Sequence, residues 1–132
     1  MKLLVDTSAF SVFGRGGDNR LDPWFTSQHS LLMPLIVIGE LRAGFAMGGR
    51  ETDNVKRLER FLEAPNVEVV KLSQQTTRLY ADVVRQLRQA GRAASSNDIW
   101  IAALAVEHHL PLLTLDRDFA AITGLQLVPL GK

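Results

Sequence analysis

The stretch LLVDTSAF, residues 3–10, decides the fold class, because a short aliphatic run ends abruptly on a carboxylate and two hydroxyls. Residues 2–5 have the length and composition of a buried strand. Asp6, Thr7 and Ser8 are side chains that start helices well, so a strand that turns directly into a helix is expected here. The Asp6 carboxylate can instead have a chemical role if other carboxylates of the chain lie close to it in the fold.

Four more aliphatic runs follow along the chain, each separated from the next by a stretch with helical periodicity. Short apolar runs that alternate with long amphipathic segments indicate βα units and a parallel sheet with helices on both faces. We therefore expect an α/β fold, a three-layer α/β/α sandwich with a central parallel sheet of four to five strands. The additional strands are expected at 31–33, 67–72, 111–115 and 125–130.

The helices between these runs have readable boundaries, since capping residues, prolines and glycines stand where helices start and stop. Residues 99–106 are apolar on every side, which is typical of a buried helix. The expected helices open at Asp22-Pro23, run from 35 to about 47, from 51 to 63, from Ser73 to Ala90, from Ser95 or Ser96 to about His108-His109, and from Asp116 to Gly124.

Composition places the chain among ordinary soluble proteins. With 132 residues it is expected to form one domain, 1–132, and 46% hydrophobic with 22% charged residues is usual for a globular fold. The absence of cysteine excludes disulfides and thiolate metal sites. No apolar run is long enough to span a bilayer and no leader segment is recognisable, so we expect a cytoplasmic protein without a membrane partner.

Four carboxylates are candidates for a common site, because ligands of parallel sheets bind outside the carboxyl ends of the strands. Asp6 ends the first expected strand, Asp116 ends the strand at 111–115, and Asp98 stands in the first turn of the buried helix. Glu40 lies on an almost wholly apolar helix, where a lone anion is costly. Small residues at 39, 43 and 44 are expected to let another backbone approach that helix.

Each of these carboxylates also has a purely structural explanation. Asp6, Asp98 and Asp116 can each cap a helix, and Ser95 with Asp98 comes close to a capping box. Glu40 can simply point to solvent. Together the structural explanations weaken, since two anions about 4 Å apart repel by roughly 4 kcal/mol at an effective dielectric constant of 20.

A cluster of oxygen ligands without His or Cys suits a hard cation such as Mg²⁺ or Mn²⁺. Two divalent ions would balance four carboxylates, and one or two ions per site are expected. Two-metal sites of this kind hydrolyse phosphodiesters. Basic side chains that could contact a phosphate backbone are Arg15, Arg50 and Arg92.

Four blocks of this sequence resemble a PIN domain of the kind found in ribonuclease toxins of VapBC-type toxin–antitoxin pairs. They occur in the family's order and cover nearly the whole chain: LLVDTSAF at 3–10, IGELRAG at 38–44, SNDIWIAALAVEHHLPLLTLDRDF at 96–119 and LQLVPL at 125–130. The resemblance implies a flavodoxin-like α/β/α sandwich.

By the same resemblance Asp6, Glu40, Asp98 and Asp116 form the acidic, metal-binding and catalytic set. Thr7 or Ser8, with Asn97, would be supporting polar groups near the metals. Thr114 would either support a metal ligand or contact the substrate, and Asp118 would be an auxiliary acid. The implied activity is metal-dependent hydrolysis of RNA phosphodiester bonds by an endoribonuclease, the toxin of a type II toxin–antitoxin module. The implied partners are RNA, a cognate antitoxin protein whose C-terminal segment lies across the acidic site, and a second copy in a homodimer or a higher toxin–antitoxin assembly.

Two other classes stay open at the level of the sequence: a non-catalytic interaction module of the same fold, and a small phosphatase. Against an aspartyl-phosphate enzyme, Ser8 occupies the position two residues after Asp6 where a second Asp is usual. The glycine-rich GRGGDN at 14–19 lacks the Gly-Lys-Ser/Thr of a P-loop and is expected to form a mobile lip beside the site.

Overall fold

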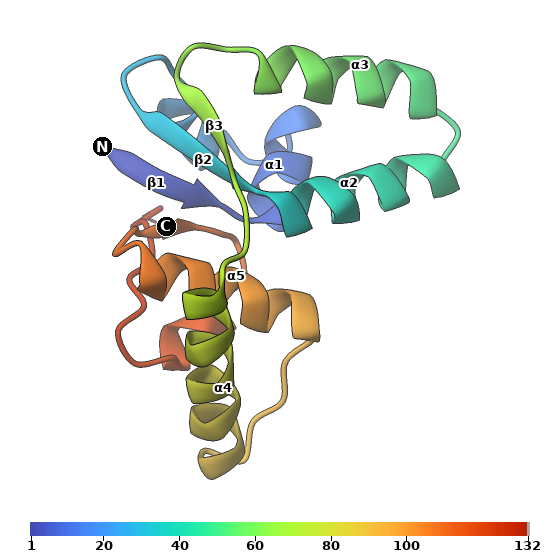
Figure 1. Cartoon of the computed structure of the whole chain (residues 1–132). Coiled ribbons are helices and arrows are strands. Elements are labelled where there is room, and N and C mark those ends of the chain that lie inside the picture. The colour runs from blue at the N-terminus through green and yellow to red at the C-terminus, as the bar shows by residue number, and fades with distance from the viewer. Residues whose placement is uncertain (132) are drawn as a thin grey trace.

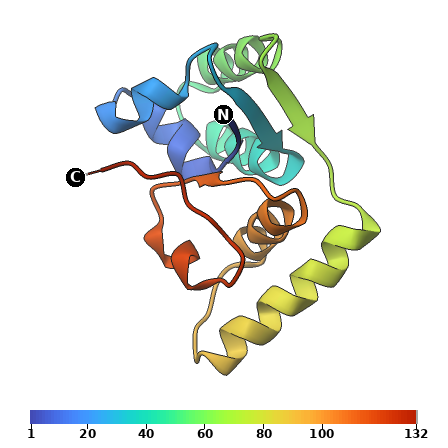
Figure 2. The same ribbon diagram turned by 90° about the vertical axis from the view of Figure 1, so that its left-hand side faces the viewer.

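The computed structural model describes residues 1–131, which form a four-stranded parallel sheet with helices packed around it (Figures 1 and 2). The strand order is β3-β2-β1-β4, and Leu4 of β1 lies in register with Leu32 on one side and Leu112 on the other. The expected α/β fold is thus confirmed, with four strands. The strands are β1 (Lys2–Val5), β2 (Ser30–Pro34), β3 (Val67–Val70) and β4 (Leu112–Leu113).

The helices fall into two groups on opposite sides of β1. In Figure 1, the first three gather with β2 and β3 in the upper half, and the last two lie with the C-terminal segment in the lower half. The α-helices are α1 (Thr7–Gly14), α2 (Leu35–Met47), α3 (Glu51–Leu62), α4 (Gln74–Gln89) and α5 (Ser96–Glu107), and the 3₁₀ helices are η1 (Asn19–Trp24) and η2 (Arg117–Ala121).

Helix α5 is the buried helix that the sequence predicts. Ile101, Ala102 and Leu104 have no exposed surface, and α5 lies between α4 and the rest of the fold (Figure 2). Because α5 feeds directly into β4 and runs back along it, its first turn lies at the edge of the sheet where β4 ends. Asp98, which stands in this first turn, therefore lies at the carboxyl edge of the sheet.

Helix α4 is fixed against α5 by polar contacts at one end. Ser73 caps α4 through a capping box with Thr76, and both hydroxyls donate to the carboxylate of Glu107 at the end of α5. The start of α4 therefore lies beside the end of α5, and the two helices run antiparallel. Gly91, with φ of +67°, ends α4 as predicted and begins the turn that leads into α5.

The expected strand at 125–130 is wrong. Only one bridge joins this segment to the sheet, between Leu112 and Leu127, with Leu112 donating to Gln126 and Val128 donating to Leu112. The physical reason is that β4 is only two residues long, since the chain turns away at Thr114 to enter the site. A two-residue strand offers too few backbone hydrogen-bonding groups for a fifth strand to pair with it.

Two short helices also differ from the prediction. Asp22 and Pro23 do not open a helix but lie inside η1, whose N-cap is Asp18. Asp18 accepts the backbone N–H of Arg20 and also binds its guanidinium, which fixes the start four residues earlier. The last helix, η2, is a 3₁₀ segment that ends at Ala121 rather than at Gly124.

The small residues of α2 do not admit another backbone from this chain. A Cβ added to Gly39 or Gly44 would meet no atom within 4 Å, and both glycines are exposed together with Ala43. Within residues 1–131 the expected close approach of a backbone is therefore not observed. In residues 1–131 no helix combines the length and the apolar character that crossing a bilayer requires.

Candidate active site

Asp6 lies at the carboxyl end of β1 with only 4% of its surface exposed. Its Oδ2 accepts hydrogen bonds from the Thr114 hydroxyl at 2.6 Å and from the Ser8 hydroxyl at 2.9 Å. Although Asp6 occupies the N-cap position of α1, its side chain makes no capping hydrogen bond. Helix capping therefore does not explain this carboxylate.

The two hydroxyls that hold Asp6 also hold the segment after β4. The fully buried Thr114 accepts the backbone N–H of Asp116 at 3.0 Å, and Ser8 accepts that of Leu115 at 3.1 Å. Each hydroxyl thus donates to the end of β1 and accepts from the segment after β4. These contacts fix Asp6 and the backbone of Asp116 relative to each other, although 109 residues separate them in the chain.

Glu40 points toward the start of α1. It lies on α2, is half-buried, and accepts a hydrogen bond through Oε1 from the Thr7 hydroxyl at 2.7 Å. The helix α2 begins directly at the carboxyl end of β2, which is next to β1 in the sheet. Adjacent strand ends therefore bring Glu40 and Asp6 to the same edge, and the explanation that Glu40 simply points to solvent is not supported.

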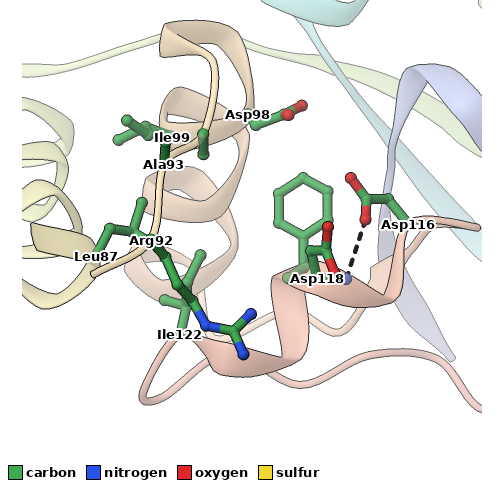
Figure 3. A pocket seen from close by; sticks show the side chains of 10 residues that line it. Leu87, Arg92, Ala93, Asp98, Ile99, Asp116, Asp118 and Ile122 are labelled. Atoms are coloured by element: carbon green, nitrogen blue, oxygen red, sulfur yellow. Dashed lines mark hydrogen bonds between the residues drawn. The ribbon is translucent and has the colours of Figure 1, made fainter. Parts of the chain in front are cut away.

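Asp98 and Asp116 lie at the starts of two helices and use their carboxylates differently. Ser95 caps α5 by accepting the N–H of Asp98 at 3.1 Å, so the Asp98 carboxylate is not the cap. Asp116 does cap η2, since its Oδ1 accepts the N–H of Asp118 at 3.0 Å (Figure 3). The half-buried Asp98 and the exposed Asp116 differ in this respect from the buried Asp6.

The electrostatics show that these carboxylates share one region. Burial raises the pKa of Asp98 above its usual value, the Ser95 hydroxyl lowers it in part, and the charges of Asp6, Asp116 and Glu40 each raise it by a smaller amount. Burial also raises the pKa of Asp6, with a smaller increase from Glu40, although hydrogen bonds from Thr114 and Ser8 lower it. The other three acids therefore lie close enough to Asp98 for their charges to act on it.

The chemistry of the donor set suits a hard divalent cation. All four donors are carboxylates, and a cation would relieve the repulsion that raises the pKa of Asp98. Within residues 1–131 no three acidic or histidine side chains already converge as a closed metal-binding group. Mg²⁺ does not require one, because it keeps several water ligands and is commonly held by one or two carboxylates.

Two hollows adjoin the acids. One, of about 240 Å³, is lined by Asp98, Asp116, Asp118 and Arg92 above an apolar floor (Figure 3). The other, of about 360 Å³, lies between α1, α2 and α3 and is lined by Thr7 and Glu40, with Arg15 and Arg57. The acidic region therefore adjoins two hollows, and each hollow is lined by at least one guanidinium.

Of the predicted basic contacts, two lie beside the acids and one does not. Arg15 and Arg92 line the two hollows, and Arg50 lines a separate depression at the turn between α2 and α3 (Figure 1). Of the segment 14–19, Gly14 and Arg15 line the hollow beside Glu40. His108 follows the last residue of α5, as predicted.

The supporting residues are placed as follows from the same contacts. Thr7 holds Glu40, Thr114 holds Asp6, and the half-buried Asn97 precedes Asp98 in the first turn of α5. Sequence reasoning did not identify the double role of Ser8, which only the pairing of β1 with β4 creates. It also missed the apolar floor beside Asp118, although the apolar positions 119 and 122 around the DRDF motif were a usable signal.

Comparisons with known proteins agree with this fold. The family model described as PIN domain matches residues 3–125. The chain is 30% identical over 123 residues to ribonuclease VapC5 of Mycobacterium tuberculosis, covering 92% of this chain and 87% of the relative.

Solved structures give the same picture. VapBC-5 of Mycobacterium tuberculosis, a member of the VapBC family of toxin–antitoxin systems, superposes with a TM-score of 0.72 at 25% identity, covering 96% of this chain and 97% of that one. VapBC-1 of nontypeable Haemophilus influenzae reaches a TM-score of 0.85 at 24% identity over the full length of both chains, a likeness of fold.

Proposed function

Because the chain belongs to the PIN-domain family, we propose that it is a metal-dependent endoribonuclease, the toxin of a type II toxin–antitoxin pair. The observation that carries this proposal is geometric: Asp6 and Glu40 follow the carboxyl ends of the paired strands β1 and β2, and Asp98 and Asp116 line one hollow. Such a group is costly in a metal-free fold and useful in a nuclease. The relative with 30% identity is itself named a ribonuclease.

The four carboxylates are the groups that would hold one or two Mg²⁺ or Mn²⁺ ions. When bound, such an ion supplies the positive charge that lowers the pKa of an attacking water and offsets charge on the phosphate. The Thr114 and Ser8 hydroxyls orient Asp6, and the Thr7 hydroxyl orients Glu40. Hydroxyl donors in these positions fix the orientation of each carboxylate.

The RNA would cross the acids between the two hollows. Arg15 and Arg57 line the hollow beside Glu40, where guanidinium groups can bind phosphates of the backbone. No histidine lines either hollow, and hydrolysis assisted by a metal requires none for general base catalysis. The arrangement supports direct attack of water on phosphorus, without a covalent enzyme intermediate.

The partners follow from the same assignment. Solved structures of similar fold are complexes of the VapBC and FitAB type, some of them bound to DNA. We therefore propose a cognate antitoxin for this chain, and a homodimer within the complex. A basic antitoxin segment lying across the four carboxylates would complement their charge.

The decisive experiment compares Asp6→Asn and Asp98→Asn with the parent chain. Both variants should lose RNA cleavage while the far-ultraviolet spectrum is unchanged, because each removes a carboxylate and keeps its volume. The measurement is 5′-end mapping of total RNA after brief induction, followed by cleavage with purified protein and Mg²⁺ or Mn²⁺. Asp53→Asn, on the exposed side of α3, is the matched control and should cleave like the parent.

Cleavage at the parental rate by both Asp6→Asn and Asp98→Asn would overturn the proposal. The same preparations distinguish the other classes. A phosphatase would hydrolyse a generic phosphate monoester faster than RNA. An interaction module would show no Mn²⁺ site by isothermal titration that is lost in Asp98→Asn.

A further inference from the structure

The hollow beside Asp98 and Asp116 has the composition of a pocket for a flat, partly apolar group. Its floor consists of aliphatic and aromatic side chains that are mostly buried, and its rim is polar (Figure 3). Pockets of this kind bind by their apolar surface and orient the ligand by a few polar groups. The floor residues are Leu87, Ile99, Phe119 and Ile122, with Ala93 and Ala94 at the side.

The charge of the rim decides which part of a nucleic acid can enter. Asp98, Asp116 and Asp118 contribute three negative charges and Arg92 one positive charge, which gives −3 + 1 = −2. When Asp98 and Asp116 hold a cation, Asp118 and Arg92 balance each other, so the rim has no net positive charge left to attract a second phosphate. A nucleobase is neutral, has two apolar faces and carries N–H donors on its edge, so it matches both the floor and the rim.

We infer that this hollow, the base pocket, receives an unpaired nucleobase of the RNA next to the scissile phosphate. The inference rests on the proposed function for the position of that phosphate. Two of the four acids, Asp98 and Asp116, form one wall of the base pocket. A nucleotide whose phosphate lies at the acids therefore has its base within reach of the pocket.

Asp118 is the residue that can read the base. It is exposed, its backbone N–H binds Asp116, and no hydrogen bond among residues 1–131 uses its carboxylate. A carboxylate is an acceptor only. Guanine offers two adjacent donors, N1–H and the N2 amino group, and can pair with both oxygens. Uracil offers one donor between two carbonyls that would repel the carboxylate, so the base pocket favours guanine.

Arg92 completes the pocket from the side of the α4–α5 connection. Figure 3 shows its side chain reaching from that segment toward η2, and it is exposed. No ion pair of residues 1–131 engages its guanidinium. A guanidinium plane can stack on a splayed base, which is a common way of holding single-stranded RNA.

The first test uses guanosine, which has no phosphate and needs no cleavage. Titration followed by amide NMR should shift resonances of residues 92–99 and 116–122, more with guanosine than with uridine. Ala93→Trp, which fills the pocket from its exposed side, should abolish the shifts. Ala81→Trp places the same indole on an exposed part of α4 outside the pocket and should leave them unchanged.

The second test measures cleavage of short single-stranded RNAs that differ only in the bases next to the scissile phosphate. Guanine should be preferred over uracil by about tenfold, the discrimination of one bidentate pair. Asp118→Asn should reduce this preference, because an amide replaces one acceptor by a donor. Arg92→Ala should weaken RNA binding, and the exposed Arg78→Ala, near the start of α4 and outside the pocket, is the control.

The outcomes separate this inference from the proposed function. Guanosine shifts in a protein that cleaves no RNA would support the base pocket and overturn the nuclease. Cleavage without base preference and without guanosine shifts would overturn the base pocket alone. An equal loss of guanine and uracil cleavage in Asp118→Asn would also overturn base reading. Shifts with N-acetyltryptophanamide but not with guanosine would assign the hollow to a protein side chain instead.

Discussion

The two halves of the acidic region are held in different ways. Asp6 and Glu40, the hydroxyl-held half, accept hydrogen bonds from the side chains of Thr114, Ser8 and Thr7. Asp98 and Asp116, the helix-start half, are placed by the caps of α5 and η2, which involve only residues two or three positions away. The first half depends on long-range pairing of strands, and the second on local turns.

This difference teaches where the site is rigid. Thr114 joins the halves, because its hydroxyl donates to Asp6 and accepts from the backbone of Asp116. The hydroxyl-held half has donors from distant parts of the chain aimed at it before any cation binds, whereas Asp98 has only the hydroxyl of Ser95, three residues before it. We therefore expect the hydroxyl-held half to orient a cation and the helix-start half to adjust to it.

The largest expected difference is between the RNA cleavage rates of Glu40→Gln and Asp116→Asn. Glu40→Gln removes a carboxylate whose orientation is fixed by the Thr7 hydroxyl. It should lower the cleavage rate at saturating Mg²⁺ by about 10² or more, which corresponds to a few kcal/mol of metal-assisted stabilisation. Asp116→Asn should lower it by only about tenfold, because the amide oxygen can still cap η2 and the side chain is exposed. Equal losses would remove the distinction between the halves.

The next effect concerns the stability that divalent ions confer. Mn²⁺ at about 100 times its dissociation constant should stabilise the parent fold by about 2.7 kcal/mol, measured as a rise in melting temperature that EDTA reverses. Asp6→Asn should respond much less, since it weakens the half that orients the ion. Asp53→Asn, on the exposed face of α3, serves as control and should respond like the parent. An unchanged response in Asp6→Asn would contradict the comparison.

A smaller difference is expected between the unfolding free energies of Thr114→Val and Thr7→Val, measured in urea. Thr114→Val removes a fully buried hydroxyl that joins two elements and leaves Asp6 and the Asp116 N–H short of a partner, which should cost about 1–3 kcal/mol of unfolding free energy. Thr7→Val should cost less than about 1 kcal/mol, because Thr7 and Glu40 are only half-buried. The reverse order would contradict the bridging role of Thr114.

The smallest effect is the dependence of stability on pH without divalent ions. The folded protein raises the pKa of Asp6 and Asp98 above 3.8, so it binds their protons more tightly than the unfolded chain does. The contribution of these two groups is complete below pH 3.8 and is lost as the pH rises through the elevated values.

Asp6→Asn should therefore gain stability relative to the parent as the pH rises from about 4 to about 7, measured in urea with EDTA. Asp18 acts in the opposite direction. Its pKa is lowered to about 2 by the hydrogen bonds and charge of Arg20, so its contribution is present above 3.8 and is lost as the pH falls toward 2. A parallel pH profile for parent and Asp6→Asn would argue against coupling at Asp6.

Much of the fold could be predicted from sequence because its signals are local. Caps at Ser73 and Ser95 and the stop at Gly91 act within one helical turn, and the structure confirms them. The errors fall where long-range contacts decide. Residues 125–130 are apolar enough for a strand but meet a two-residue β4, and Asp18 captures Arg20 and with it the start of η1.

The same division holds for the site. The residue types and their spacing single out Asp6, Glu40, Asp98 and Asp116. Their oxygen-only ligand chemistry favours a hard divalent cation. Both conclusions depend only on composition and on residue order along the chain. Which hydroxyl aims which carboxylate, and that Ser8 and Thr114 bridge β1 to the segment after β4, follows only from the pairing of the strands. The sequence alone determined which groups are available. The tertiary structure decided which of them touch, because hydrogen bonds between residues a hundred positions apart depend on packing that no local pattern encodes.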